Sequence, residues 1–221
     1  MLSLLIFFPL LAALVTAFSG EHAKKVAFAA AIVEFAYSLC LFFRFDPAGG
    51  IQFTENFAWI TNLGISYHIG MDGIALLLIM LTTFLVPLII LSSFNHKYKS
   101  PSLFYSLILT MQFALVGVFS AYDGFLFYIF WELALIPIYL ICLMYGGKDR
   151  LRITLKFFIY TLTGSLLMLV ALIYLWLQTP GTHSFDLQAL YALNLSSVEQ
   201  SWIFWGLFLA FAIKMPVFPF H

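Results

Sequence analysis

Three ionisable side chains, Glu34, Glu132 and Lys214, lie well inside apolar stretches of this sequence. A charge at bilayer depth costs about 2.5 to 3.5 kcal/mol on insertion scales, so such residues usually face a protein interior or water and act there. Glu132 lies near the middle of the run FLFYIFWELALIPIYLICLMYGG. A carboxylate and an amine that change each other's hold on a proton are the components of a proton relay. Glu132 and Lys214 are therefore the candidates for proton translocation.

The helix around Glu132 is expected to carry a polar stripe. At 100° per residue, Tyr128 and Tyr139 fall within about 40° of Glu132. Pro137 cannot donate a hydrogen bond to the carbonyl of Leu133, which frees an acceptor near the carboxylate and predicts a kink. The alternative is that Glu132 is a structural carboxylate that hydrogen-bonds between helices.

Lys214 lies in the segment AFAIKMPVFPFH. There, Pro216 and Pro219 remove the hydrogen bonds to the carbonyls of Ala212 and Met215. A broken helix is tolerated at membrane depth only where its backbone is buried in protein or lines a wet cavity, and such helices mark ion sites in transporters. The alternative is that Lys214 extends its amine to a membrane interface.

A third polar stripe lies on the helix after the basic loop, where Lys156, Tyr160 and Thr163 have helical spacing. Lys156 is close to that loop, so extension of its amine to the interface is the competing interpretation. The candidate proton-path residues are Tyr128, Tyr139, Lys156, Tyr160 and His221.

Other polar residues near the predicted spans are expected to be structural. Glu34, with Tyr37 and Ser38 one turn on, is expected to hydrogen-bond a neighbouring helix. His68 and Asp72 lie near a membrane entry, where Asp72 suits the first turn of a helix.

The composition is that of an integral membrane protein, since 63% of the 221 residues are hydrophobic and 9% are charged, against about 25% charged in soluble domains. Ten basic and ten acidic residues balance, so nothing indicates a nucleic-acid partner. Cys40 and Cys142 lie in apolar runs and read as small hydrophobic residues. The sequence has none of the common nucleotide, zinc or redox motifs, so we expect no cofactor and no metal in this chain.

Seven apolar windows are long enough for helices that cross a bilayer core of about 30 Å, and the alternation typical of a β-barrel is missing. We therefore predict an all-α integral membrane protein. The windows are roughly Leu2 to Phe18, Lys25 to Phe43, Asp72 to Leu91, Leu103 to Tyr122, Asp123 to Tyr145, Ile153 to Leu177 and Ser201 to His221.

Lys and Arg concentrate in the first, third and fifth connections, which predicts that these face the cytoplasm and that the N-terminus lies on the other side. The second connection, within residues 44–70, has turn residues and alternation that favour an extended segment or a hairpin. The sixth, 178–200, favours a short interfacial helix. The basic residues of the odd connections are Lys24, Lys25, Lys97, Lys99, Lys148, Arg150 and Arg152.

Several motifs together resemble the antiporter-like membrane subunits of respiratory complex I. The resemblance depends mainly on FYIFWELALIPIYLI, KFFIYTLTGSLLML and FAIKMPVFPFH. The motifs SYHIGMDGIALLL and AYDGFLFY fit it as well. Within that family, FWE followed by LIPIYLI is most similar to the chain M group, the counterpart of mitochondrial subunit 4. The resemblance spans essentially the whole chain.

This resemblance implies a proton-translocating subunit in which Glu132 and Lys214 form a coupled pair in one half-channel. Residues 1–91 would be N-terminal transmembrane helices, and 103–221 an incomplete first proton-channel repeat. A chain that stops in an apolar segment is expected to be a fragment of such a subunit, since the second repeat is missing.

The same resemblance implies the surroundings of the chain. Flavin, iron–sulfur clusters, NADH and quinone are expected in partner subunits, and the neighbours are expected to be the antiporter-like chains L and N in a bacterial inner membrane. The alternatives are a subunit of a multisubunit cation/proton antiporter and a passive membrane scaffold.

Overall fold

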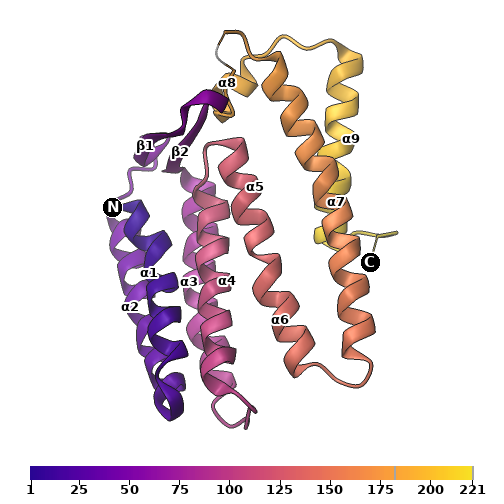
Figure 1. Ribbon diagram of the computed structural model, residues 1–221. Helices are drawn as coiled ribbons and strands as arrows, with labels where there is room; N and C mark the ends of the chain where they lie inside the picture. The colour runs from indigo at the N-terminus through magenta and orange to yellow at the C-terminus, as the bar shows by residue number, and fades with distance from the viewer. Residues whose placement is uncertain (182, 221) are drawn as a thin grey trace.

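The computed structural model describes residues 1–181 and 183–220, and it is built mainly of helices (Figure 1). The α-helices are α1 (Leu2–Ala17), α2 (Ala23–Arg44), α3 (Gly73–Ser92), α4 (Pro101–Ser120), α5 (Gly124–Leu133), α6 (Leu135–Tyr145), α7 (Arg150–Gln178), α8 (Leu187–Tyr191) and α9 (Ser197–Lys214). Two strands, β1 (Gln52–Ile60) and β2 (Ile65–Met71), and the short 3-10 turns Gly20–His22 and Thr61–Leu63 complete the described part of the chain.

The predicted all-α membrane class is confirmed, because five helical segments of the described chain are long and apolar enough to span a bilayer. They are Gly20–Arg44, Gly73–Ser92, Pro101–Ser120, Gly124–Tyr145 and Arg150–Gln178. The other two predicted windows form shorter helices, α1 with 16 residues and α9 with 18. The predicted number of seven spans is therefore not established.

Helices α1 to α4 form a bundle whose members alternate in direction (Figure 1). Helix α4 packs against α1, α2 and α3. The hydroxyl of Ser106 on α4 donates to the carbonyl of Ala13 on α1 at 2.8 Å, and the hydroxyls of Ser38 and Thr83 lie 2.8 Å apart between α2 and α3. Helix α4 therefore packs both against the first three helices and against α5, the helix that follows it.

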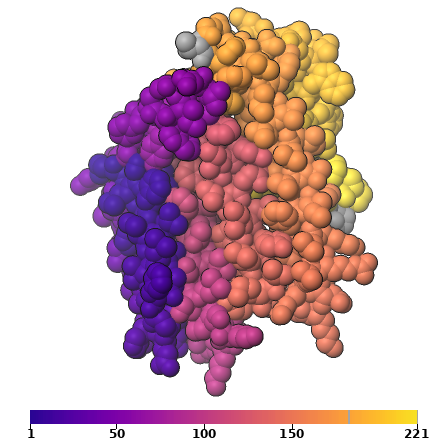
Figure 2. Space-filling view, in the orientation of Figure 1, coloured from indigo at the N-terminus to yellow at the C-terminus, as the bar shows by residue number. Residues whose placement is uncertain are grey.

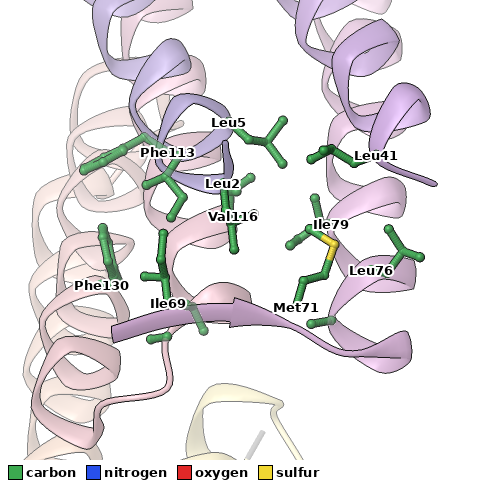
Figure 3. Packing of buried hydrophobic residues seen from close by; sticks show 14 of the residues in the cluster. Leu2, Leu5, Leu41, Ile69, Met71, Leu76, Ile79, Phe113, Val116 and Phe130 are labelled. Atoms are coloured by element: carbon green, nitrogen blue, oxygen red, sulfur yellow. The ribbon is translucent and has the colours of Figure 1, made fainter. Parts of the chain in front are cut away.

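The predicted hairpin is present as β1 and β2, which pair antiparallel. Gly64 turns the chain into β2 with φ of +61°, and a Cβ there would lie 2.0 Å from the carbonyl oxygen of His183, so only glycine fits. Ile69 and Met71 of β2 are fully buried, and they cap the end of the bundle beside Leu2 of α1 (Figure 3).

The connection between α7 and α9 lies at the same end of the molecule as the hairpin (Figure 2). Three backbone hydrogen bonds join the hairpin, the start of α5 and the connection after α7. The N–H of Tyr122 donates to the His68 carbonyl at 2.8 Å, that of Gly124 to the Phe185 carbonyl at 2.7 Å, and that of Leu187 to the Tyr122 carbonyl at 2.9 Å. The short helix predicted in this connection is α8.

Helices α5 and α6 lie between the four-helix bundle and the pair formed by α7 and α9 (Figure 1). The helix is interrupted at Ala134, three residues before Pro137. Because Pro137 has no N–H, the turn before it cannot complete its ladder of hydrogen bonds. The predicted distortion beside Glu132 is confirmed.

Candidate functional site

Lys214 is the last residue of α9. The helix begins with a capping box between Ser196 and Glu199 and ends before Pro216, which cannot continue the hydrogen-bond ladder. The carbonyl of Ala212 does not stay unpaired, because the N–H of Val217 reaches it at 2.9 Å. The sequence predicted the loss of the Pro216 hydrogen bond but not this replacement donor.

The ammonium of Lys214 binds to the end of a second helix. Its Nζ donates a hydrogen bond to the backbone carbonyl of Trp131 at 2.9 Å and lies 4.0 Å from the centroid of the Trp131 ring. Trp131 is in the last turn of α5, where carbonyls lack intrahelical partners. A positive charge is favoured at a helix C-terminus, and Lys214 lies at two such ends, those of α5 and α9.

Glu132 is the residue after that carbonyl and is partly buried. It lies within electrostatic range of Lys214 and of the Tyr128 hydroxyl, but no ion pair among the described residues includes it. Its Oε1 is buried without a hydrogen-bond partner in the described part of the chain. Glu132 and Lys214 therefore lie near each other and interact through space, without direct contact.

The other residues of the predicted proton path lie in different surroundings, and they are not all close to Glu132. Tyr128 lies near Glu132 and interacts with Ser165 of α7. The Tyr139 ring packs against Phe158 at 5.0 Å between centroids. Tyr139 thus contacts α7, and the stripe that it shares with Tyr128 and Glu132 stays a prediction.

Lys156 is exposed at the other end of α7, which agrees with the interpretation that its amine reaches the interface. The Tyr160 hydroxyl donates to the Phe220 carbonyl at 3.3 Å and so contacts the segment after α9. His221 lies outside the described residues.

A polar cluster at the hairpin end was not foreseen as a unit. Nδ1 of His68 lies 2.6 Å from Oδ2 of Asp186. Asp123 caps α5 by accepting from Phe125 and Leu126, and its other oxygen accepts from the N–H and hydroxyl of Ser66. Burial raises the pKa of Asp123, although these hydrogen bonds oppose the shift.

Two neighbours extend this cluster. Asp72 caps α3 by accepting from the Ala75 N–H at 2.7 Å, as predicted for a helix first turn. Burial, together with the negative charge of Asp72, raises the pKa of Tyr122 to about 12. The acceptor Asp186 is 118 residues from His68 in the chain, so no local sequence signal could have joined them.

The described residues contain no group of three or more His, Cys, Asp or Glu side chains that could hold a metal ion. Cys40 and Cys142 are free and exposed on the helix surface.

Two family models match the chain. Residues 1–118 match the model described as NADH-ubiquinone oxidoreductase chain 4, amino terminus. Residues 121–221 match the model described as NADH:quinone oxidoreductase/Mrp antiporter, TM.

Curated relatives agree with these models. F(420)H(2) dehydrogenase subunit M of Methanosarcina mazei is 40% identical over 99% of this chain and 46% of its own length. NADH-quinone oxidoreductase subunit M of Rhodobacter capsulatus is 40% identical over 100% of this chain and 46% of its own. The chain thus spans about half the length of the curated relatives it matches.

Solved structures have the same fold. A chain of respiratory complex I from Thermus thermophilus with bound NADH matches all of this chain and 45% of its own, with a TM-score of 0.90 and 31% identity. A chain of the Mrp complex from Dietzia sp. matches 99% of this chain and 24% of its own, with a TM-score of 0.86. At 15% identity, that second likeness concerns the fold alone.

Proposed function

Since this chain belongs to the antiporter-like membrane subunits of NADH:quinone oxidoreductase, the chain 4 or subunit M group, we propose that it translocates protons through Glu132 and Lys214. The observation that supports this function is the position of Lys214, whose ammonium binds the carbonyl of Trp131 at the interrupted end of α5. Interrupted helices that present charged groups at membrane depth are characteristic of ion sites.

The proton on Lys214 is held by three features: the Trp131 carbonyl, the Trp131 ring, and the negative charge of Glu132. When Glu132 takes up a proton, the third attraction is lost and the Lys214 ammonium releases its proton more readily. When Glu132 loses its proton again, Lys214 is recharged. Because the two groups do not touch, each can exchange protons with a path while it still responds to the other.

The family also suggests the membrane, the orientation and the neighbouring subunits of this chain. We place the chain in a bacterial inner membrane with its N-terminus on the non-cytoplasmic side, beside antiporter-like chains L and N. Residues 103–221 would contribute to the first proton-channel repeat. By the same family likeness, partner subunits would carry the flavin, the iron–sulfur clusters and the NADH and quinone sites.

The test is Glu132→Gln in the complete subunit, assembled with its complex and reconstituted into vesicles. Proton pumping coupled to quinone reduction should fall by roughly 100-fold, the lower end of what one proton-transfer group contributes. NADH oxidation by an artificial acceptor should be unchanged. Unchanged pumping would contradict the proposal and favour the passive scaffold.

Glu199→Gln is the matched control. This glutamate caps α9 through Ser196 and accepts from the Tyr174 hydroxyl at 2.5 Å, and glutamine can serve in the same capping box. Pumping by this variant should match that of the wild type.

A second candidate function is a subunit of a multisubunit cation/proton antiporter, because the model that matches residues 121–221 covers both groups. Co-purification separates the two. Flavin-containing and iron–sulfur-containing partners indicate the oxidoreductase, whereas a complex of membrane subunits alone indicates the antiporter.

A further inference from the structure

Glu34 on α2 and Gln112 on α4 are buried polar side chains outside the site described above. Glu34 is 1% exposed and Gln112 is 0% exposed. Both carboxylate oxygens of Glu34, and both the oxygen and the nitrogen of the Gln112 amide, lack a hydrogen-bond partner in the described part of the chain. The prediction that Glu34 hydrogen-bonds a neighbouring helix is therefore wrong, because the polar groups beside it are already engaged. Tyr37 donates to the Met1 carbonyl, and Ser38 pairs with Thr83.

The cross-helix contact between Ser38 and Thr83 sets the depth of Glu34. Glu34 lies four residues before Ser38 on α2, and Pro87 lies four residues after Thr83 on the antiparallel helix α3. At 1.5 Å per residue, both lie about 6 Å from that contact in the same direction. Glu34 and Pro87 are thus at the same level of the bundle.

The contact between Ser106 and Ala13 sets the depth of Gln112 in the same way. Toward the hairpin, Gln112 lies about 9 Å along α4 and Pro9 about 6 Å along α1. Gln112 and Pro9 therefore differ by only about 3 Å in level.

Each of the two polar side chains lies among apolar core residues along its own helix. On α2, Glu34 lies between Ala31 of one cluster and Leu41 of the other. On α4, Gln112 lies between Leu109 of the first cluster and Val116 of the second. Glu34 is therefore enclosed by the apolar core of the bundle.

Two prolines interrupt the helical hydrogen-bond ladders of the bundle. Pro9 and Pro87 are buried inside α1 and α3. A proline inside a helix leaves the carbonyl four residues earlier without its helical donor, here those of Leu5 and Thr83.

No cation is available to balance an ionised Glu34. Helices α1, α3 and α4, which pack against α2, contain no Asp, Glu, Lys, Arg or His, and the only titratable side chain among them is Tyr105. The Tyr105 hydroxyl already pairs with Ser93. On α2 itself, the basic residues Lys24, Lys25 and Arg44 are nine or ten residues away, about 14 to 15 Å along the helix.

The remaining charges near the bundle lie at its two ends. Glu55 of β1 binds the N-terminal ammonium at one end, and Glu21, His22 and Lys25 lie at the other. A buried carboxylate without a paired cation is strongly disfavoured. The buried Glu34 carboxylate therefore requires a monovalent cation, and the smallest is the proton.

We propose that Glu34 is a second proton-binding site, in which the buried carboxyl carries a proton at neutral pH. The protonated carboxyl is neutral, so it can stay buried without a paired cation. The site stands apart from Glu132 and Lys214, so it does not depend on their role.

Infrared difference spectroscopy of the purified membrane complex tests the site directly. At neutral pH, wild type minus Glu34→Gln should show the C=O stretching band of a protonated carboxyl. Because glutamine imitates the neutral carboxyl, this variant should assemble normally. Failure to assemble, or a spectrum without that difference band, would overturn the proposal.

Glu199→Gln is the control, since loss of this hydrogen-bonded surface carboxylate should not change the band.

A hydrophobic carbodiimide supplies an independent readout without any substitution. It reacts with protonated carboxyls in apolar surroundings, and the tryptic peptide from Val26 to Arg44 has Glu34 as its only side-chain carboxyl. Labelling of this peptide at neutral pH, unaffected by exchange of sodium for potassium, supports the proton site. Protection by sodium would show that sodium is the bound cation and overturn the proposal.

Discussion

The side chain of Lys214 and the backbone of Trp131 meet at 2.9 Å, across 83 residues of sequence, at the point where α5 is interrupted. The lysine takes the place of the amide that would satisfy this carbonyl in a continuous helix. The aromatic face of the same residue lies 4.0 Å from the ammonium. One residue thus offers two acceptors for one cation, and the carboxylate of Glu132 follows it in the chain.

The ring of Trp131 should contribute measurably to the hold on Lys214. A desolvated cation–π contact is worth about 2 kcal/mol, and that attraction is stronger for Trp than for Phe. We expect pumping to fall in the order wild type, Trp131→Phe, Trp131→Leu, with the backbone hydrogen bond preserved in all three. Initial rates of proton uptake in vesicles measure the series. Equal rates for the Leu variant and the wild type would show that the ring does not act on Lys214.

Pro137→Ala should separate stability from function. The new N–H can pair with the Leu133 carbonyl, and proline inside a helix costs about 3 kcal/mol relative to alanine. The variant should therefore be at least as heat-stable as the wild type. Its pumping should fall, because a straightened helix re-pairs the Trp131 carbonyl within the helix and displaces Lys214.

Pro101→Ala is the control for that variant, since Pro101 occupies the first turn of α4, where proline is favoured. Thermal unfolding and pumping should both stay near wild-type values. If both variants pump at the wild-type rate, the interruption of α5 does not position Lys214.

The contrast between Glu132 and Glu34 shows how far the sequence could lead. Apolar runs and prolines are local, so the helices, the hairpin and the distortion before Pro137 could be predicted. Which groups face a buried charge depends on helices far apart in the chain. The Trp131 carbonyl as acceptor for Lys214, and the lack of any hydrogen-bond partner for Glu34 among the described residues, could therefore be seen only in three dimensions.

The Glu55 carboxylate should make the attachment of α1 to the hairpin depend on pH. Burial raises its pKa, but hydrogen bonds from the N-terminal ammonium and from Ser3 outweigh that effect, and the pKa of Glu55 is lowered. A lowered pKa stabilises the fold above the unfolded-state value of about 4.3, and this contribution is lost as pH falls through the folded pKa.

Glu55→Gln should therefore speed hydrogen exchange in the first turn of α1 near neutral pH. The ratio of exchange rates between the variant and the wild type should approach one at acidic pH, since both are then uncharged at this position. A ratio that stays constant with pH would contradict the assignment.

Gly117→Ala should disturb the site from a distance through the contact between α4 and α5. A Cβ at Gly117 would lie 2.3 Å from the ring of Phe130, which is 4% exposed and directly precedes Trp131. Overpacking of this kind typically costs about 1 to 3 kcal/mol. Because the ring is confined, α5 must shift and carry the Trp131 carbonyl away from Lys214.

Gly206→Ala on α9 is the control, because a Cβ there would lie 3.5 Å from its nearest neighbour, Ala171, which is an ordinary contact. We expect lower thermal stability and slower pumping for the first variant and neither for the second, whereas equal behaviour of the two would show that the packing of α5 on α4 does not control the site.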